Sequence, residues 1–429
     1  MATLIQEKDE TSNAESLTKK QKILTRVLAI ANTGGQNFYF NYATILAVGI
    51  GATALMMAFI TAIQNLGSAL FQTFFGKMSD KIGRKLVLIT GFVIASISTA
   101  VIAFLSSPII FMVVIAIYSL GISMVIPTWN ALLGDISTEK TRTKIISQIS
   151  MIGSFFSSMI LLLLGFLTDF LPFDILKKYR VMILIGALFF AMAAILSILI
   201  SETNANKKNR KKSSFWEPMK DRKFLKFTGI TMTWWFVMSF LWPLSPIVNA
   251  SVNPTNTQLA IMSVVFAVFI AFGQWICGFF ADKIGRRFTL VLGFISFSLV
   301  PVILAYSYTW TIILVANVFG GLGNGFLTVT LSSEILHLSK EETKGAYSGT
   351  YNLMTGIVSF FGAFVGGFLY DGFLNAYNSA FALKISLLII AAIRFIAILP
   401  TLFLSINEKK KLDESGVEKV KLIDKKQPL

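Results

Sequence analysis

The sequence contains very little of what chemistry at an active site requires. Its 429 residues include one cysteine and one histidine, and only 14% of them are charged, whereas roughly 25% of an average soluble protein is charged. The single cysteine, Cys277, excludes an intrachain disulfide. One histidine without clustered cysteines argues against a metal site. We therefore expect no enzyme activity, no metal and no cofactor.

Apolar residues, by contrast, make up 55% of the chain. A membrane-spanning helix takes roughly 20 apolar residues, so this supply is sufficient for about twelve spans. Backbone groups in lipid must be hydrogen-bonded internally, which favours helices. The sequence therefore predicts an all-α integral membrane protein. The twelve apolar stretches cover residues 27–47, 52–75, 86–106, 109–133, 145–169, 181–201, 227–249, 257–280, 288–307, 310–335, 345–370 and 379–404.

The distribution of basic residues predicts the orientation. Of the 38 lysines and arginines, 33 lie in the two tails or in the loops that follow even-numbered stretches. Because cytoplasmic loops collect basic residues, both termini are expected in the cytoplasm of a multi-pass protein of the plasma membrane. The net charge of +16 then marks the inner face, and a nucleic-acid partner is not expected.

The sequence also matches itself after a shift of 202 residues. The segment 76–85 overlies 278–287, and Gly165–Asp169 overlies Gly367–Asp371. Such a repeat predicts two parallel six-helix bundles with a cavity at their interface. The expected divisions are a cytoplasmic tail at 1–26, a bundle at 27–201, a basic cytoplasmic linker at 202–226, a second bundle at 227–404 and a second cytoplasmic tail at 405–429.

Both repeated loops carry the pattern G-x-x-x-D-K-x-G-R-K/R. This pattern resembles the signature between helices 2 and 3 of the major facilitator superfamily. The resemblance implies two pseudo-symmetric bundles around a central cavity and secondary transport by alternating access. The resemblance also implies that the protein interacts with a small-molecule substrate and with the lipid bilayer. The sequence assigns no subfamily, and it contains no phosphate-binding loop for ATP-driven export.

The repeated loops are candidates for a gate. Carboxylates are stabilised near helix N-termini. Asp80 could therefore dock on the start of the eleventh stretch (345–370), and Asp282 on the start of the fifth (145–169), while the cytoplasmic side is closed. The alternative is that these loops only fix the membrane topology and do not act as a gate. The candidate gating residues are Gly76, Asp80, Gly83, Arg84, Asp135, Arg142, Gly278, Asp282, Gly285, Arg286, Glu334 and Lys344.

Amides gather on one face of the first span and tryptophans on the equivalent face of the seventh. Amides facing lipid would be costly, so both faces are expected to border the cavity. Interfacial anchoring and packing between helices are the alternatives for the tryptophans. The candidate pathway residues are Asn32, Gln36, Asn37, Asn41, Gln64, Trp234, Trp235, Met238, Trp242, Asn324 and Asn352.

These walls suit a neutral or amphipathic solute such as a sugar or another metabolite, carried by a monomer. A proton is a candidate co-substrate, although the stretches contain few titratable groups. Proton-coupled drug or metabolite efflux is one alternative. A receptor or sensor that binds a ligand without transporting it is another.

Asp80→Asn tests the gate. Loss of the carboxylate should reduce turnover more than apparent substrate affinity, because the docking contact stabilises a state of the cycle rather than the bound solute. Transport rates at matched expression measure this, and unchanged transport would contradict the gating role.

Overall fold

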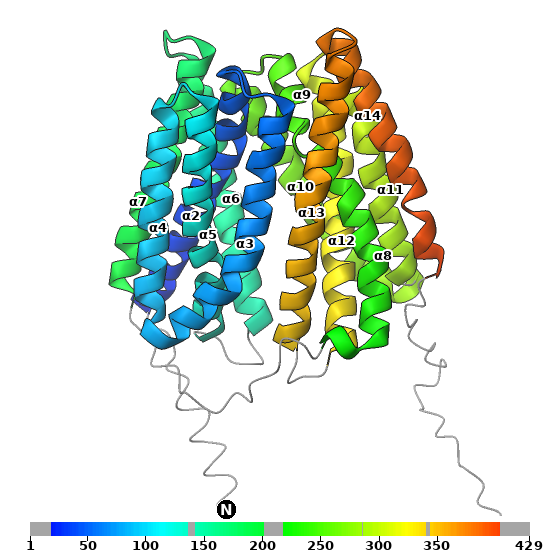
Figure 1. The fold of residues 1–429 in the computed structure, drawn as a ribbon. Coiled ribbons are helices and arrows are strands. Elements are labelled where there is room, and N and C mark those ends of the chain that lie inside the picture. Colours follow the sequence, from blue (N-terminus) through cyan, green and yellow to red (C-terminus); the bar gives the residue numbers. More distant parts are fainter. Residues whose placement is uncertain (1–18, 136–141, 201–217, 285, 340–343, 404–429) are drawn as a thin grey trace, which may run out of the picture.

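The computed structural model describes residues 19–135, 142–200, 218–284, 286–339 and 344–403. The described chain is helical in almost its whole length (Figure 1). The helices are α2 (Lys19–Gly49), α3 (Ala54–Ile82), α4 (Arg84–Phe104), α5 (Pro108–Asp135), α6 (Arg142–Asp169), α7 (Ile175–Leu199), α8 (Arg222–Met238), α9 (Ser245–Ser251), α10 (Asn256–Ile284), α11 (Arg286–Leu304), α12 (Trp310–Leu338), α13 (Lys344–Leu374) and α14 (Ser379–Ile396). Short 3₁₀ helices are η1 (Pro218–Lys220), η2 (Ser239–Leu241) and η3 (Leu399–Phe403).

Eleven spans in the described ranges are long and apolar enough to cross a membrane, and α8, η2 and α9 together form one of them. The remaining long helix is α2, with 31 residues. Its amides lower its hydropathy, yet it is long enough to cross a bilayer. The prediction of an all-α membrane protein is confirmed.

The internal repeat reappears in the helix boundaries. Helix α3 covers residues 54–82 and α10 covers 256–284, so both ends differ by 202. The first residues of α4, α5 and α6 have counterparts at the same offset in α11, α12 and α13. Between α3 and α4, Gly83 has φ of 102°, which is a conformation that glycine adopts without steric cost.

The first six helices form one half of the molecule and the remaining helices the other (Figure 1). The halves meet mainly where α3 packs on α13 and where α6 packs on α10, while α2 also touches α9. We call the end at which α2 and α8 begin the basic end. We call the end at which α6 stops the Asp169 end.

The structure interrupts the seventh span, which the sequence predicts as one helix over 227–249. Helix α8 stops at Met238, and the chain passes through η2 before α9 begins at Ser245. Pro243 and Pro246 explain the break, because proline lacks an N–H group and clashes with the preceding turn.

Arg394 stabilises this break from α14. The side chain is fully buried, and its Nη2 donates to the Met238 carbonyl oxygen at 2.6 Å and its Nη1 to that of Phe297 at 2.8 Å. The Phe297 carbonyl faces Pro301 four residues on, which has no N–H group. The amide of Trp242 bonds to Ser239 instead of Met238. Arg394 thus supplies donors to two carbonyls that the helices leave without their usual partners.

Arg394→Lys should lower the free energy of unfolding by about 1–3 kcal/mol. Lysine keeps the charge but lacks the planar fork that reaches two carbonyls on two helices. Thermal unfolding of purified protein measures the loss. Lys384→Met is the matched control, because Lys384 lies on the same helix and contacts the ring of Tyr306, a contact of about 0.5–1 kcal/mol. An unfolding temperature of Arg394→Lys equal to that of the parent would contradict this role.

Candidate functional site

The amide face of α2 lies against α6 and α10. Asn37 Nδ2 donates to Ser157 Oγ of α6 at 2.9 Å. Asn41 Oδ1 accepts a hydrogen bond from Ser263 Oγ of α10, which belongs to the other half. Asn32 Oδ1 accepts from Gln36 Nε2 at 2.8 Å. Gln36, Asn37 and Asn41 are half-buried. Of these amides, Asn41 contacts the other half, whereas Asn32, Gln36 and Asn37 bond within the first half. Their role in a pathway stays a prediction.

The tryptophans of α8 separate into two environments. Trp234 is fully buried and stacks on Phe294 of α11, with ring centroids 4.1 Å apart. Trp235 is half-buried, and its Nε1 donates to Tyr351 Oη of α13 at 3.1 Å. Trp242 lies beside it, with centroids 6.5 Å apart. The structure therefore places Trp235 and Trp242 together, and it places Trp234 in the core of the second half.

The other pathway candidates are distributed over four helices. Gln64 of α3 donates from Nε2 to Tyr39 Oη at 2.7 Å, and Asn324 Oδ1 of α12 accepts from Thr328 Oγ1 at 3.0 Å. Asn352 of α13 is exposed. Met238 is buried at the end of α8, where its main chain contacts Arg394 and its side chain belongs to the core.

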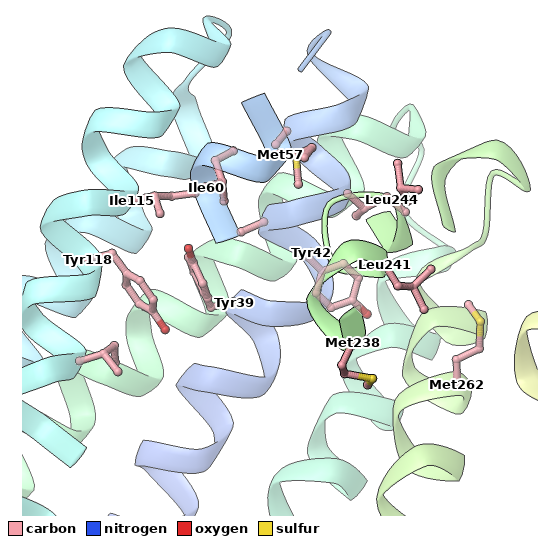
Figure 2. Close-up of a cluster of buried hydrophobic side chains, with 14 of the residues drawn as sticks. Tyr39, Tyr42, Met57, Ile60, Ile115, Tyr118, Met238, Leu241, Leu244 and Met262 are labelled. Carbon is pink, nitrogen blue, oxygen red and sulfur yellow. The ribbon is translucent and has the colours of Figure 1, made fainter. Parts of the chain in front are cut away.

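Large apolar side chains from both halves belong to one buried cluster. Figure 2 shows Leu241 and Leu244, from the interrupted seventh span, close to Tyr42 of α2. Met57 and Met262 belong to the same continuous cluster of buried residues, which includes members from both halves. The apolar cores of the two halves are therefore continuous in this state.

Hydrogen bonds join the halves at the Asp169 end. The Asp169 carboxylate accepts from the backbone amides of Asn256 and Thr257 at 3.0 and 2.9 Å. Tyr42 Oη donates to the Asn256 carbonyl oxygen at 3.1 Å, and Tyr179 Oη donates to that of Pro254 at 2.6 Å. The described state is therefore fastened at this end.

The candidate gating residues lie at the basic end. Gly76 of α3 packs near Pro127 of α5, Arg84 is half-buried and Glu334 of α12 is buried. The structure does not describe the side chains of the remaining charged candidates, the surroundings of Gly278 or any part of Gly285, so the docking of the loop carboxylates stays a prediction. These charged candidates are Asp80, Asp135, Arg142, Asp282, Arg286 and Lys344.

Sequence reasoning missed the hydrogen-bond partners of this site. Ser157 is one of several serines in its stretch and Ser263 lies in an apolar one, and no pattern distinguishes them from residues that pack between helices. The repeated Gly165–Asp169 and Gly367–Asp371 segments place a carboxylate at the end of each helix. That symmetry was the one available signal for the contact at the Asp169 end.

The family model of the Major Facilitator Superfamily matches residues 26–242 and again 227–428. The chain belongs to this superfamily. The two matches correspond to the two halves, and the prediction made from the loop signature is confirmed.

Three relatives with different names are similar to parts or most of this chain. The chain is 26% identical over 381 residues to the proton-coupled antiporter flippase LtaA of Staphylococcus saprophyticus subsp. saprophyticus, covering 86% of this chain and 89% of that protein. It is 23% identical over 197 residues to the quinolone resistance protein NorA of Staphylococcus aureus, or 46% of each chain. A 90-residue segment, 21% of this chain, is 34% identical to hexose transporter 1 of Plasmodium yoelii yoelii and spans 18% of that protein.

Solved structures show the same fold. The nucleoside transporter NupG superposes with a TM-score of 0.73 at 13% identity, covering 89% of this chain and 98% of that one. A bacterial homologue of the human lysosomal transporter Spinster, inward-facing and occupied, gives 0.67 at 14% identity over 91% and 97% of the two chains. These likenesses concern the fold alone.

Trp235→Ala should weaken solute binding by about 1–2 kcal/mol, which is roughly 5- to 30-fold in affinity. The substitution removes a half-buried indole that lies beside Trp242 and bonds to Tyr351 of α13. Titration with solutes that raise the unfolding temperature measures the change. Trp234→Phe is the control, because Trp234 lies in the core and its substitution should alter stability and leave affinity unchanged. An unaltered affinity in Trp235→Ala would remove this residue from the pathway.

Proposed function

We propose that this protein is a secondary transporter that moves a neutral or amphipathic small organic solute across the plasma membrane by alternating access. The observation that carries the proposal is the hydrogen bond from Ser263 to Asn41, which joins the amide face of α2 to the other half. A solute bound between these faces would contact both halves, so its binding and release can be coupled to their relative movement.

The chemistry of the two faces supports the solute class. Asn37 and Asn41 offer amide donors and acceptors, whereas Trp235 and Tyr351 offer aromatic surfaces. Amides recognise hydroxyls and carbonyls, and aromatic faces cover apolar rings or the flat face of a sugar. None of these four side chains carries a charge at neutral pH, which favours an uncharged or amphipathic solute.

The basic residues support an orientation with both termini in the cytoplasm. In that orientation the Asp169 end faces outward, and the described state is closed to the outside. We propose that the transporting unit is the single chain in its bilayer, without a cofactor.

Proton-coupled antiport is the second candidate. Its specific support is the similarity to a proton-coupled antiporter flippase over 86% of this chain. Proton coupling requires titratable groups that both sides of the membrane can reach in turn. Glu334 is buried in α12, and Asp169 and Asp371 are half-buried at helix ends, so these three carboxylates are the candidates for carrying a proton.

Two measurements test the proposed function. A thermal-shift screen of purified protein against sugars, nucleosides, organic acids, amino acids and amphipathic drugs identifies a solute. Counterflow of that solute is then measured in proteoliposomes. Counterflow at collapsed proton gradient supports transport, whereas binding without counterflow would contradict it and favour a receptor.

The proton gradient separates the two transport modes. A transporter without coupling should equilibrate its solute and respond little to an imposed pH difference. An antiporter should accumulate solute against its gradient when protons flow the other way, and Glu334→Gln should abolish that accumulation while leaving counterflow. Accumulation that persists in Glu334→Gln would exclude Glu334 as the proton carrier.

A further inference from the structure

The first turn of α10 receives its hydrogen bonds from two different parts of the chain. Thr255 and Gln258 form a reciprocal pair: the Gln258 amide donates to Thr255 Oγ1 at 3.3 Å, and the Thr255 amide donates to Gln258 Oε1 at 3.0 Å. This is a capping box, which leaves the first two amides of the helix without a partner.

Asp169 of the other half supplies those partners. Its Oδ1 accepts from the Asn256 amide at 3.0 Å, and its Oδ2 accepts from the Thr257 amide at 2.9 Å and from Thr257 Oγ1 at 2.5 Å. One residue earlier, Thr168 Oγ1 accepts from Asn256 Nδ2 at 2.8 Å. The last turn of α6 therefore completes the cap of a helix that belongs to the opposite half.

The internal repeat places a second carboxylate in the equivalent position. A shift of 202 residues relates Asp169 to Asp371 and Thr255 to Thr53. Thr53 caps α3 through the Met56 amide. Gly367 of α13 packs against Ala54 and Leu55 at the start of α3, so Asp371, one turn later, is in position to meet the Leu55 amide. Leu55 stands where Thr257 does and has no hydroxyl, so this second contact is the weaker one.

We propose that Asp169 and Asp371 form a pair of trans-acting helix caps that hold the Asp169 end closed, with Asp169 as the stronger member. Asp169 ends α6 and binds the N-terminus of α10, and Asp371 lies in the last turn of α13, where it would meet the N-terminus of α3 in the same way. Separation of the halves at this end would leave the first two amides of α10 and a carboxylate to be hydrated, so the contacts favour the closed state.

The inference rests on the proposed alternating-access function, because a latch requires a second state. The loop carboxylates Asp80 and Asp282 are predicted to act in the same way at the basic end. Since the halves rock, one end opens as the other closes, so the two sets of caps would be made in alternation.

Cysteine labelling measures the open population at this end. Ala58 is fully buried in the second turn of α3, where it packs against Gly367 of the other half. In a Cys277→Ser background, Ala58→Cys reacts with a maleimide in proportion to the fraction of molecules open at this end. The protein is studied in nanodiscs, so no solute is required.

Asp169→Ala should raise the rate of labelling at position 58 by a few-fold up to about 30-fold, which is the range that corresponds to losing a helix cap. Asp169→Asn should raise it less, because the amide oxygen still accepts a hydrogen bond. Asp371→Ala should fall between the parent and Asp169→Ala. Asp174→Ala is the matched control, because Asp174 caps α7 within its own half.

The native Cys277 reports on global unfolding. It is fully buried in α10, and its labelling in Asp169→Ala with Ala58 intact should match that of the parent. Labelling of position 58 at the parent rate in Asp169→Ala, or an equal rise in Asp174→Ala, would overturn the latch. A rise at position 58 in a protein that shows no counterflow of any solute would retain the latch and contradict the transport function instead.

Discussion

Backbone polar groups inside this bundle need partners within the protein, because hydrocarbon offers none. Much of the structure follows from that constraint. Thr61 and Ser386 return their hydroxyls to carbonyls of the preceding turn. Arg394 serves the carbonyls of Met238 and Phe297, where a helix break and a proline remove the usual donors. A charged side chain in the core is therefore a consequence of irregular backbone.

The sequence predicts the fold well because its signals are local and repeated. Each apolar stretch is long enough to cross a bilayer on its own, and one ungapped offset relates the halves, so helix order and pairing follow without tertiary information. The boundaries of α3 and α10 reproduce the offset at both ends. Gly83, a glycine of the signature, adopts a positive φ in the turn between α3 and α4.

The candidate site is predicted less completely, because orientation depends on neighbouring helices. Trp234 and Trp235 are adjacent on α8, yet one stacks in the core and the other reaches Tyr351. Hydropathy treats them alike. Pro243 and Pro246 indicate the break after Met238. The apolar stretch around them is nevertheless long enough to cross a membrane as one helix, so length alone does not predict the break. Partners such as Ser157 become visible only when two helices are placed side by side.

The turn before α10 shows how far such a contact reaches into the sequence. Asn253 has φ of 45°, in the left-handed region that few residues other than glycine, asparagine and aspartate adopt. This residue reverses the chain so that Pro254 and Asn256 meet the tyrosines and the carboxylate of the first half. The contacts that close this end therefore depend on the backbone conformation of Asn253 as well as on the charge of Asp169. The start of α10 at Asn256 requires a positive φ at residue 253, so glycine, asparagine and aspartate are favoured there.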